Sequence, residues 1–321
     1  MAIVQIVVSD CDHESMKPEE KVFAENGMTF RVLRCRTEED LIAQCKGVNI
    51  VLNQYAPFTP KVFATLKPDL RQIVRYGVGV NNIDLDAATA SGVQVCNVPD
   101  YGVHEVSNHA LALILALERK IVFMNERTRG GAWDCSLAIP IRRISELTVG
   151  IAGVGRIGGT LARKLQPLGC RVVGYDPAYG PGSPEMQGAE WVPFDRLVSE
   201  SDFITLHCPL TPETRDMFDA AVLGRMKRTA FIINTARGGI IDEVALAGAL
   251  RRGALAGAAL DVVEREPLAA DSPLRGTDNC LLTPHMAWYS EEAGLELKRK
   301  VAEEAVSFAR GEPVHYPVNA L

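Results

Sequence analysis

Short runs of β-branched and other apolar residues alternate with segments of helical periodicity along most of the chain. This alternation predicts parallel strands joined by helices. In the first hundred residues the runs that predict strands are IVQIVVS, TFRVLRC, NIVLNQY, RQIVRYG and VQVCNV, and the helical segments between them are KPEEKVFAENG, TEEDLIAQC, TPKVFATL and LDAATASG. Pro18 and Pro60 stand where a first helical turn tolerates a missing N–H, and Thr37 has capping-box spacing with Asp40. The first third of the chain therefore predicts a complete small α/β domain.

A long apolar segment follows, VHEVSNHALALILALERKIVFMNERTRGG. It is apolar on more than one face and stops at Gly130 and Gly131. This pattern predicts one helix of about 28 residues from Val103, buried between two bodies and bridging two domains.

The alternation then resumes from Leu147. The runs LTVGIAG, CRVVGYD, FITLHC, AFIINTA, LAGAALDV and CLLTPH predict strands. The segment from Gly180 to Gly188 is rich in Gly and Pro and predicts a surface loop. A final amphipathic helix is expected to begin with a cap at Ser290 and to end at Gly311.

Length and composition narrow the protein class. With 321 residues the chain exceeds the size at which a single core usually stops growing, so two domains are expected. Hydrophobic residues make up 47% and charged residues 23%, as in a soluble protein. No apolar run is long enough to cross a bilayer and no secretory signal is recognisable, so we expect a cytoplasmic location.

Charge and cysteine content argue against several partners. The net charge is −6, which gives no general reason to expect nucleic acid or an anionic membrane as a partner. The eight cysteines form no CxxC motif and have no histidines at metal-ligand spacing. We expect them to be reduced thiols, and we predict no metal site.

The stretch VGIAGVGRIGGTLARKL contains Gly153, Gly155 and Gly158 in the order G-x-G-x-x-G, between a predicted strand and a predicted helix. In this context the glycines predict a turn that lets a dinucleotide pyrophosphate approach the helix N-terminus. Asp176 ends the next strand, 23 positions after Gly153, where it can bind the ribose hydroxyls. Its charge would repel a 2′-phosphate, and no Arg follows it in YDPAYG, so NAD is expected rather than NADP.

Three residues follow later strands, at the edge where ligands bind in open α/β sheets: Arg237 in INTARGG, Glu266 in DVVEREP and His285 in TPHMAW. The planar fork of Arg237 suits a carboxylate or a polarised carbonyl. His285 is suited to proton exchange near neutral pH, and a carboxylate on its other nitrogen would fix its tautomer. Each also has a simpler interpretation: a surface ion pair for Arg237, an exposed loop for Glu266 and a strand-end hydrogen bond for His285.

Several motifs together resemble one family. In chain order they are RYGVGVNNIDLDAATASGVQVCNVP, GVGRIG, LHCPLTPETR, INTARGG, DVVEREP and TPHMAWYS. They resemble the D-isomer-specific 2-hydroxyacid dehydrogenases over essentially the whole chain. VRYGVGVNNID and TPHMAWYS look most like the branch that includes the C-terminal-binding proteins and their bacterial relatives, alongside phosphoglycerate dehydrogenase-like members.

The resemblance implies an α/β fold of two Rossmann-like domains. A flavodoxin-like substrate-binding domain, residues 1–98 completed by 288–321, would be interrupted by an NAD-binding Rossmann domain, residues 99–287. The two crossings, near Pro99 and Ala287, would act as hinges. The fingerprint lies in mid-chain, on this view, because its domain is an insertion.

The resemblance also implies roles for residues. His285 would exchange the proton with the substrate oxygen, Glu266 would pair with His285, and Arg237 would hold the carboxylate and polarise the carbonyl. The other substrate contacts would be the backbone N–H groups of Val78 and Gly79, Arg75 as a second anion contact, and Trp288, which is equally consistent with interdomain core. The cofactor contacts would be Gly153, Gly155, Arg156, Ile157 and Gly158 around the pyrophosphate, Asp176 at the ribose, Cys208 and Pro209 on the adenine side, Thr214, and Thr235, Ala236 and Asp261 at the nicotinamide end.

The activity implied is reversible, NAD-dependent hydride transfer to a small 2-keto acid, of the glyoxylate or hydroxypyruvate type. A D-3-phosphoglycerate dehydrogenase is the first alternative, although the loop LNQYAPFTP carries no Arg or Lys before Lys61 to hold a phosphate. A second alternative is a scaffold that senses NAD(H), as in the corepressors of the C-terminal-binding branch. Family precedent further implies a homodimer through the dinucleotide domain, with the helix after Val103 at the interface.

Overall fold

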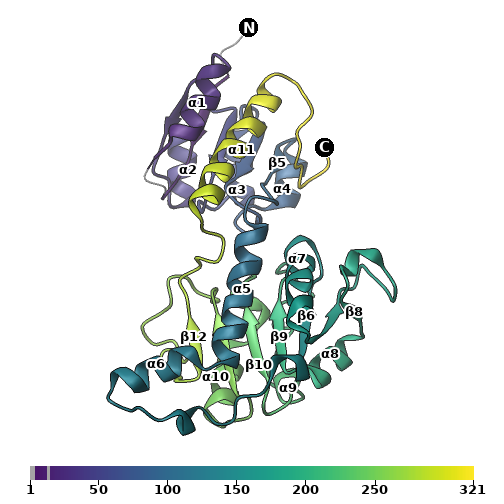
Figure 1. Ribbon diagram of the computed structural model, residues 1–321. Coiled ribbons are helices and arrows are strands. Elements are labelled where there is room, and N and C mark those ends of the chain that lie inside the picture. Colours follow the sequence, from purple (N-terminus) through teal and green to yellow (C-terminus); the bar gives the residue numbers. More distant parts are fainter. Residues whose placement is uncertain (1–3, 13–14) are drawn as a thin grey trace. The chain divides into compact units, whose positions relative to one another are not determined.

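The computed structural model describes residues 4–12 and 15–321, and the chain divides into two compact units (Figure 1). One unit combines the residues up to Gly102 with Ser290–Leu321, and the other consists of Val103–Tyr289. The second unit is thus inserted into the first. The crossings fall after residues 102 and 289, a few residues from those expected from the sequence.

The first unit contains a five-stranded sheet in the order β2-β1-β3-β4-β5, with every neighbouring pair parallel. This order is that of flavodoxin-like folds, as expected. Its strands are β1 Ile6–Val8, β2 Phe30–Val32, β3 Ile50–Asn53, β4 Gln72–Arg75 and β5 Gln94–Cys96.

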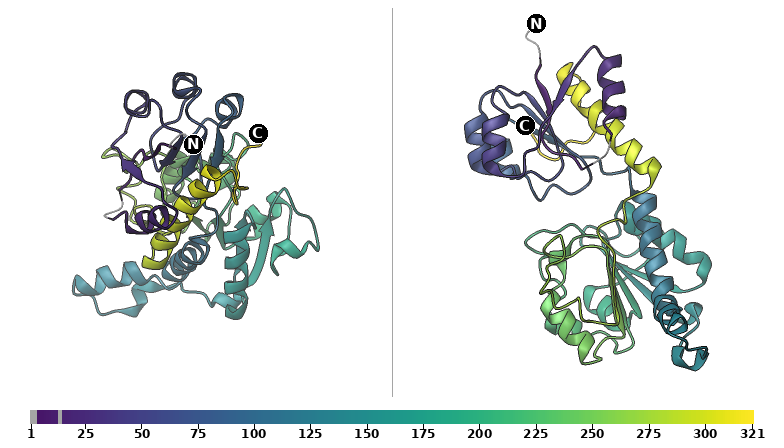
Figure 2. Two further views of the ribbon diagram at one scale, coloured as in Figure 1. Left: turned by 90° about the horizontal axis from the view of Figure 1, so that it is seen from above. Right: turned by 90° about the vertical axis from the view of Figure 1, so that its left-hand side faces the viewer.

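Helices cover both faces of this sheet: α1 Lys17–Glu25, α2 Glu38–Gln44, α3 Pro60–Leu66, α4 Leu85–Ala90 and α11 Glu291–Ala309. Figure 2 shows α1 and α11 together on one face, with the other helices opposite. The expected start signals are confirmed: proline opens α1 and α3, Thr37 and Asp40 form a capping box, and Ser290 Oγ accepts the Ala293 N–H at 3.0 Å.

The second unit contains a seven-stranded parallel sheet in the order β12-β11-β10-β9-β6-β7-β8. Numbered within the unit, this is the Rossmann order 3-2-1-4-5-6 with a seventh strand at the edge. Its strands are β6 Thr148–Ala152, β7 Arg171–Tyr175, β8 Glu190–Trp191, β9 Phe203–Leu206, β10 Phe231–Asn234, β11 Gly257–Leu260 and β12 Cys280–Leu282. The predicted α/β fold with two Rossmann-like domains is confirmed, and β8 is an additional short strand.

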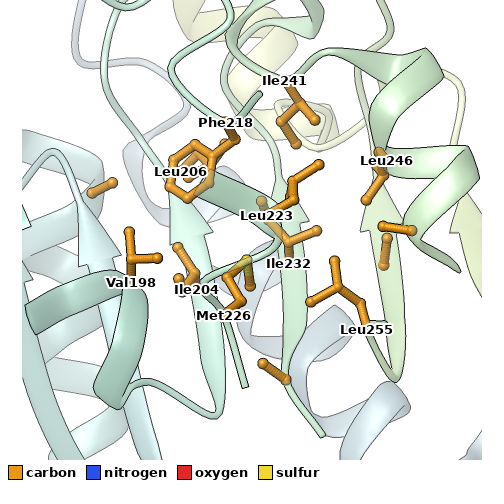
Figure 3. Close-up of a cluster of buried hydrophobic side chains, with 14 of the residues drawn as sticks. Val198, Ile204, Leu206, Phe218, Leu223, Met226, Ile232, Ile241, Leu246 and Leu255 are labelled. Carbon is orange, nitrogen blue, oxygen red and sulfur yellow. The ribbon is translucent and has the colours of Figure 1, made fainter. Parts of the chain in front are cut away.

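The helices of this unit are α5 Val103–Glu118, α6 Ile121–Arg129, α7 Arg156–Leu165, α8 Phe194–Glu200, α9 Ala220–Leu223 and α10 Glu243–Arg251, with short 3₁₀ turns at Cys135–Ala138, Ile144–Glu146, Gln166–Leu168, Pro184–Met186 and Gly238–Ile240. A buried apolar cluster joins the sheet to α8, α9 and α10 (Figure 3). Ile204 and Ile232 from the strands and Phe218 from the loop before α9 are fully buried in it.

The single long helix expected from Val103 is wrong. The chain breaks into α5 and α6 at Lys120, whose φ of 53° is left-handed and cannot continue an α-helix. The apolar residues of α5 are buried against the sheet and α7, whereas α6 buries none of its residues. Because burial stabilises a helix mainly through its apolar face, the charged stretch Glu118–Lys120 marks the end of the packed helix.

Within the residues that the structure describes, no helix has the length and apolar content needed to cross a membrane. All eight cysteines are free thiols.

Candidate active site

The glycine-rich turn after β6 forms a cradle at the start of α7. Gly153 has a φ of 91°, a backbone conformation that residues with a side chain rarely adopt. A Cβ on Gly158 would lie 2.1 Å from the carbonyl oxygen of Gly153, so helix and strand approach closely only because this residue is glycine. The first N–H groups of α7, at Arg156 and Ile157, have no partners within the helix and are available to an anion. Gly155 is exposed, with no atom within 4 Å of its Cβ position.

Asp176 is held against this cradle. One carboxylate oxygen accepts the Val154 N–H at 2.9 Å, and the other accepts the Ala178 N–H at 3.0 Å. The negative charge therefore lies beside the fingerprint, where a cofactor ribose would be expected.

The loop after β9 borders the same turn. A Cβ on Gly153 would lie 2.6 Å from the backbone nitrogen of Cys208, so the two segments are in direct contact. Burial raises the pKa of the Cys208 thiol to about 11, so it stays protonated. Thr214 closes the next turn by donating its hydroxyl to the carbonyl of Pro209 at 2.7 Å. Of the three residues predicted here, Cys208 directly adjoins the fingerprint.

Thr235 and Ala236 follow β10. The hydroxyl oxygen of Thr235 is buried and has no hydrogen-bond partner among the described residues, an arrangement that suits a ligand with its own polar groups. Asn234 shapes the turn, because its amide oxygen accepts the Ala236 N–H at 2.9 Å and its amide nitrogen donates to the carbonyl of Arg237 at 2.7 Å. The cradle, Asp176 and Thr235 together fit a dinucleotide.

His285 and Glu266 meet, although 19 positions separate them. Nδ1 of His285 lies 2.6 Å from Oε2 of Glu266, and both side chains are nearly two-fifths exposed. Burial tends to raise the pKa of Glu266, but the hydrogen bond and charge of His285 outweigh it, and Arg237 lowers it further. The pKa of Glu266 therefore lies below its ordinary value, and the carboxylate is an acceptor only.

Arg237 belongs to the same side of the sheet. Its Nη1 donates to the carbonyl of Ala236 at 2.7 Å, and the side chain is half-buried. The next residue, Gly238, packs against the backbone of the loop that carries Glu266: a Cβ there would lie 1.9 Å from the carbonyl carbon of Val263. Glu266 is exposed in its loop and His285 is hydrogen-bonded after a strand, as their simpler interpretations state, but the two side chains also form one pair.

Asp261 is buried, and its oxygens accept hydrogen bonds from the loop that carries His285. Its carboxylate accepts the Thr283 hydroxyl at 2.6 Å and the N–H groups of Met286 and Ala287 at 3.0 and 2.9 Å, while its carbonyl accepts the His285 N–H at 2.7 Å. The contact to a nicotinamide carboxamide remains a prediction. The observed partners show that Asp261 holds the His285 loop.

Sequence reasoning missed two residues of this site. His109 on α5 and Thr283 after β12 contact each other, with 3.1 Å between Nε2 and Oγ1. Thr283 is the first residue of the TPHMAW motif, but His109 lies within an apolar helix that carries no recognised motif. A histidine on the buried side of an otherwise apolar helix was the available signal.

The remaining predicted residues are placed within their own units. Val78 and Gly79 follow β4, where the Arg75 guanidinium lies over Gly77 and the Asn97 amide donates to the carbonyl of Val78 at 2.6 Å. Trp288, in the other unit, packs edge-to-face on Tyr289 with 5.5 Å between ring centroids.

The chain is similar to known proteins in sequence and in fold. Residues 111–287 match the model of the D-isomer specific 2-hydroxyacid dehydrogenase NAD binding domain. A glyoxylate reductase of Korarchaeum cryptofilum is 39% identical over 80% of the chain and 78% of that protein. A D-3-phosphoglycerate dehydrogenase of Archaeoglobus fulgidus is 38% identical over 92% of the chain, which spans only 56% of that protein. The D-lactate dehydrogenase of Aquifex aeolicus, solved with NAD and lactic acid, superposes with a TM-score of 0.86 at 26% identity, over 96% of each chain.

Proposed function

The chain belongs to the D-isomer-specific 2-hydroxyacid dehydrogenase family, and from that premise we propose that it is an NAD-dependent oxidoreductase that reduces a small, unphosphorylated 2-keto acid, glyoxylate or hydroxypyruvate. The pair of His285 with Glu266 is the observation that carries the proposal. It supplies an oriented proton donor at the carboxyl edge of an NAD-binding sheet.

The pair determines which nitrogen meets the substrate. Because the Glu266 carboxylate only accepts, Nδ1 of His285 is its donor, and Nε2 is left to give the proton to the substrate oxygen. Arg237 presents a planar donor fork that orients the substrate carboxylate and polarises the carbonyl. NADH, when bound, supplies the hydride.

We assign the cofactor to the cradle of the second unit, with the pyrophosphate on Arg156 and Ile157 and the nicotinamide end near Thr235 and Ala236. Asp176 supports NAD over NADP, because a 2′-phosphate would lie against its carboxylate. Two further substrate contacts are candidates, each within its own unit: Arg75 with the N–H groups of Val78 and Gly79 in the first unit for a carboxylate, and Trp288 in the second unit for apolar substrate atoms.

The loop after β3 supports an unphosphorylated substrate. The Gln54 amide donates to Asp12 at 2.6 Å, the Tyr55 hydroxyl lies 3.3 Å from the other Asp12 oxygen, and Asp10 accepts the Gln54 N–H at 3.2 Å. Among the described residues of the loops after β1 and β3, up to Pro60, there is no Lys or Arg. The positive charge that acts on Tyr55 comes from Arg75, which we assign to the carboxylate.

The assay is NADH oxidation with glyoxylate, hydroxypyruvate, 3-phosphohydroxypyruvate and pyruvate, each repeated with NADPH. We expect glyoxylate or hydroxypyruvate to exceed the phosphorylated acid at least tenfold in kcat/KM, and Tyr55→Arg, compared with Tyr55→Phe, to narrow that difference. Preference for the phosphorylated acid would establish the phosphoglycerate alternative. Tight NADH binding without turnover of any acid would favour the dinucleotide-sensing scaffold.

We also propose that two copies associate through the segment from α6 to β6. Its exposed apolar side chains include Trp133, 92% exposed, and Ile139, 74% exposed. The segment borders a cavity of about 670 Å³ whose mostly apolar walls also carry charges of both signs, among them Arg228 and Asp278. Such a surface can pair with a second copy of itself about a two-fold axis.

Light scattering during size-exclusion chromatography tests this association. We expect a dimer that dissociates in the double variant Trp133→Glu/Ile139→Glu and persists in Leu295→Glu, a control that is 57% exposed on α11. A monomeric parent protein would refute the proposal.

We place this metabolic enzyme in the cytoplasm, where free thiols stay reduced.

A further inference from the structure

His109 on α5 reaches the loop that carries His285. Its Nε2 lies 3.1 Å from the hydroxyl oxygen of Thr283 and 3.6 Å from Oδ1 of Asp261. The Thr283 hydroxyl lies 2.6 Å from the same Asp261 oxygen. Three side chains from distant parts of the sequence thus form a continuous chain of contacts.

The direction of the hydrogen bonds follows from the number of protons available. Both Asp261 oxygens accept backbone N–H groups, from Met286 and Ala287, so the carboxylate acts as acceptor. The single hydroxyl proton of Thr283 goes to this carboxylate at 2.6 Å. The Thr283 oxygen must therefore accept from His109, and Nε2 of His109 carries a proton.

The helix that carries His109 is itself anchored. Nζ of Lys164, on the fingerprint helix α7, donates to Ser107 Oγ at 2.6 Å, Asn108 Oδ1 at 2.7 Å and the carbonyl of His104 at 3.1 Å. The His109 side chain is only 18% exposed. His109 is therefore a donor held at a defined point of the second unit, next to the residues that bind Lys164.

The loop at His285 needs such support. His285 has a φ of 52°, a left-handed conformation that costs a non-glycine residue free energy unless its surroundings hold it there. The Thr283 N–H pairs with Leu260, and from Thr283 to Ala287 the loop depends on Asp261. A rotation of Asp261 would release the hydrogen bonds to Thr283, Met286 and Ala287 together.

We propose that His109 is a positioning residue that acts through Thr283 and Asp261 to hold the His285 loop in its working conformation. The proposal rests on the function assigned above to His285. By donating from Nε2 to the Thr283 oxygen, His109 keeps the Thr283 hydroxyl proton directed at Asp261. Both Asp261 oxygens then remain in place to accept hydrogen bonds from the loop. His109 itself does not touch the substrate.

The variants His109→Leu and His109→Gln test the proposal, because a Gln amide retains an N–H donor on a flexible side chain. We expect His109→Leu to lower kcat for the preferred 2-keto acid ten- to a hundredfold with unchanged NADH affinity, and His109→Gln to recover most of it. The double variant with Thr283→Val should be no worse than Thr283→Val alone, because both act through one contact. His104→Leu, on an exposed position of the same helix, is the matched control.

Hydrogen exchange of the peptide around residues 283–287 gives a second measurement that does not depend on turnover. We expect faster exchange there in His109→Leu, and parental exchange in His104→Leu. If the parent enzyme reduced none of the acids, the function assigned to His285 would fail, while the exchange result would still test the contact. Unchanged kcat and exchange in His109→Leu, or a His109→Gln variant as defective as His109→Leu, would overturn the proposal.

Discussion

Gly238 lies where the turn that carries Arg237 packs against the loop that carries Glu266. Replacing it with Ala should lower kcat/KM strongly and the free energy of unfolding only moderately. The added Cβ would lie 1.9 Å from the carbonyl carbon of Val263 and 2.2 Å from the nitrogen of Glu264. These are backbone atoms, so no change of rotamer relieves the clash. To reach ordinary contact at 3.4 Å, the turn at Arg237 and the loop of Glu266 must move apart by about 1.5 Å.

This displacement separates Arg237 from the pair of Glu266 and His285. Because a misplacement of about 1 Å can cost about a hundredfold in rate, we expect kcat/KM of Gly238→Ala to fall by about two orders of magnitude. The strain should cost about 1–3 kcal/mol of the free energy of unfolding, so most of the protein stays folded. NADH affinity should fall less than kcat/KM, because the pyrophosphate cradle follows β6 and only the nicotinamide end, near Thr235 and Ala236, adjoins the displaced turn.

The assay compares NADH oxidation, NADH binding by fluorescence and urea unfolding in Gly238→Ala and Gly276→Ala. Gly276 has no atom within 4 Å of its Cβ position and serves as the matched control in the same unit. A Gly238→Ala enzyme that kept kcat/KM within threefold of the parent would show that the spacing of these two segments does not control the reaction.

Four further predictions concern single side chains. His285→Ala should abolish most turnover while NADH affinity is retained, measured by single-turnover kinetics and titration. Asp176→Ala should weaken NAD binding and reduce its advantage over NADP, measured as the ratio of the two kcat/KM values. Because the low pKa of Glu266 keeps it ionised, Glu266→Gln removes a charge that favours a protonated imidazole, so the decline of keto-acid reduction with rising pH should begin at lower pH. Asp202→Ala should cost about 1–3 kcal/mol in urea unfolding, because its buried carboxylate accepts a backbone N–H at 2.9 Å and binds two cations that face water.

Local signals predicted the elements well. Some features depend only on residues a few positions apart in the sequence: the capping box of Thr37 and Asp40, the cap at Ser290 and the glycine fingerprint. A short stretch of sequence therefore contains all the groups that interact. The break at Lys120 was missed because α5 ends where its packing against the sheet ends, and that depends on residues far along the chain.

The candidate site was predictable in its strand-end residues and not in its supporting contacts. Arg237, Glu266 and His285 carry functional groups in the loops that follow apolar strands β10, β11 and β12, where ligands bind in open α/β sheets. Their supports were not recognised in this way: His109 lies within a helix, and Asp261 was expected to bind the cofactor rather than the loop of His285. Which hydrogen bonds a polar residue makes depends on what the fold brings next to it.

The topology explains why three motifs from one half of the chain converge. Arg237 follows β10, Asp261 and Glu266 follow β11, and His285 follows β12, and these strands are neighbours in that order at the edge of the sheet. Parallel strands about 4.8 Å apart place their carboxyl ends in a row, so each loop needs to extend only one strand spacing to reach the next. Glu266 closes the gap to His285, and Asp261 ties the β12 loop to β11. A reacting group at this edge is therefore aligned by neighbouring loops of a rigid sheet. The contact from His109 on α5 adds a support from outside the row.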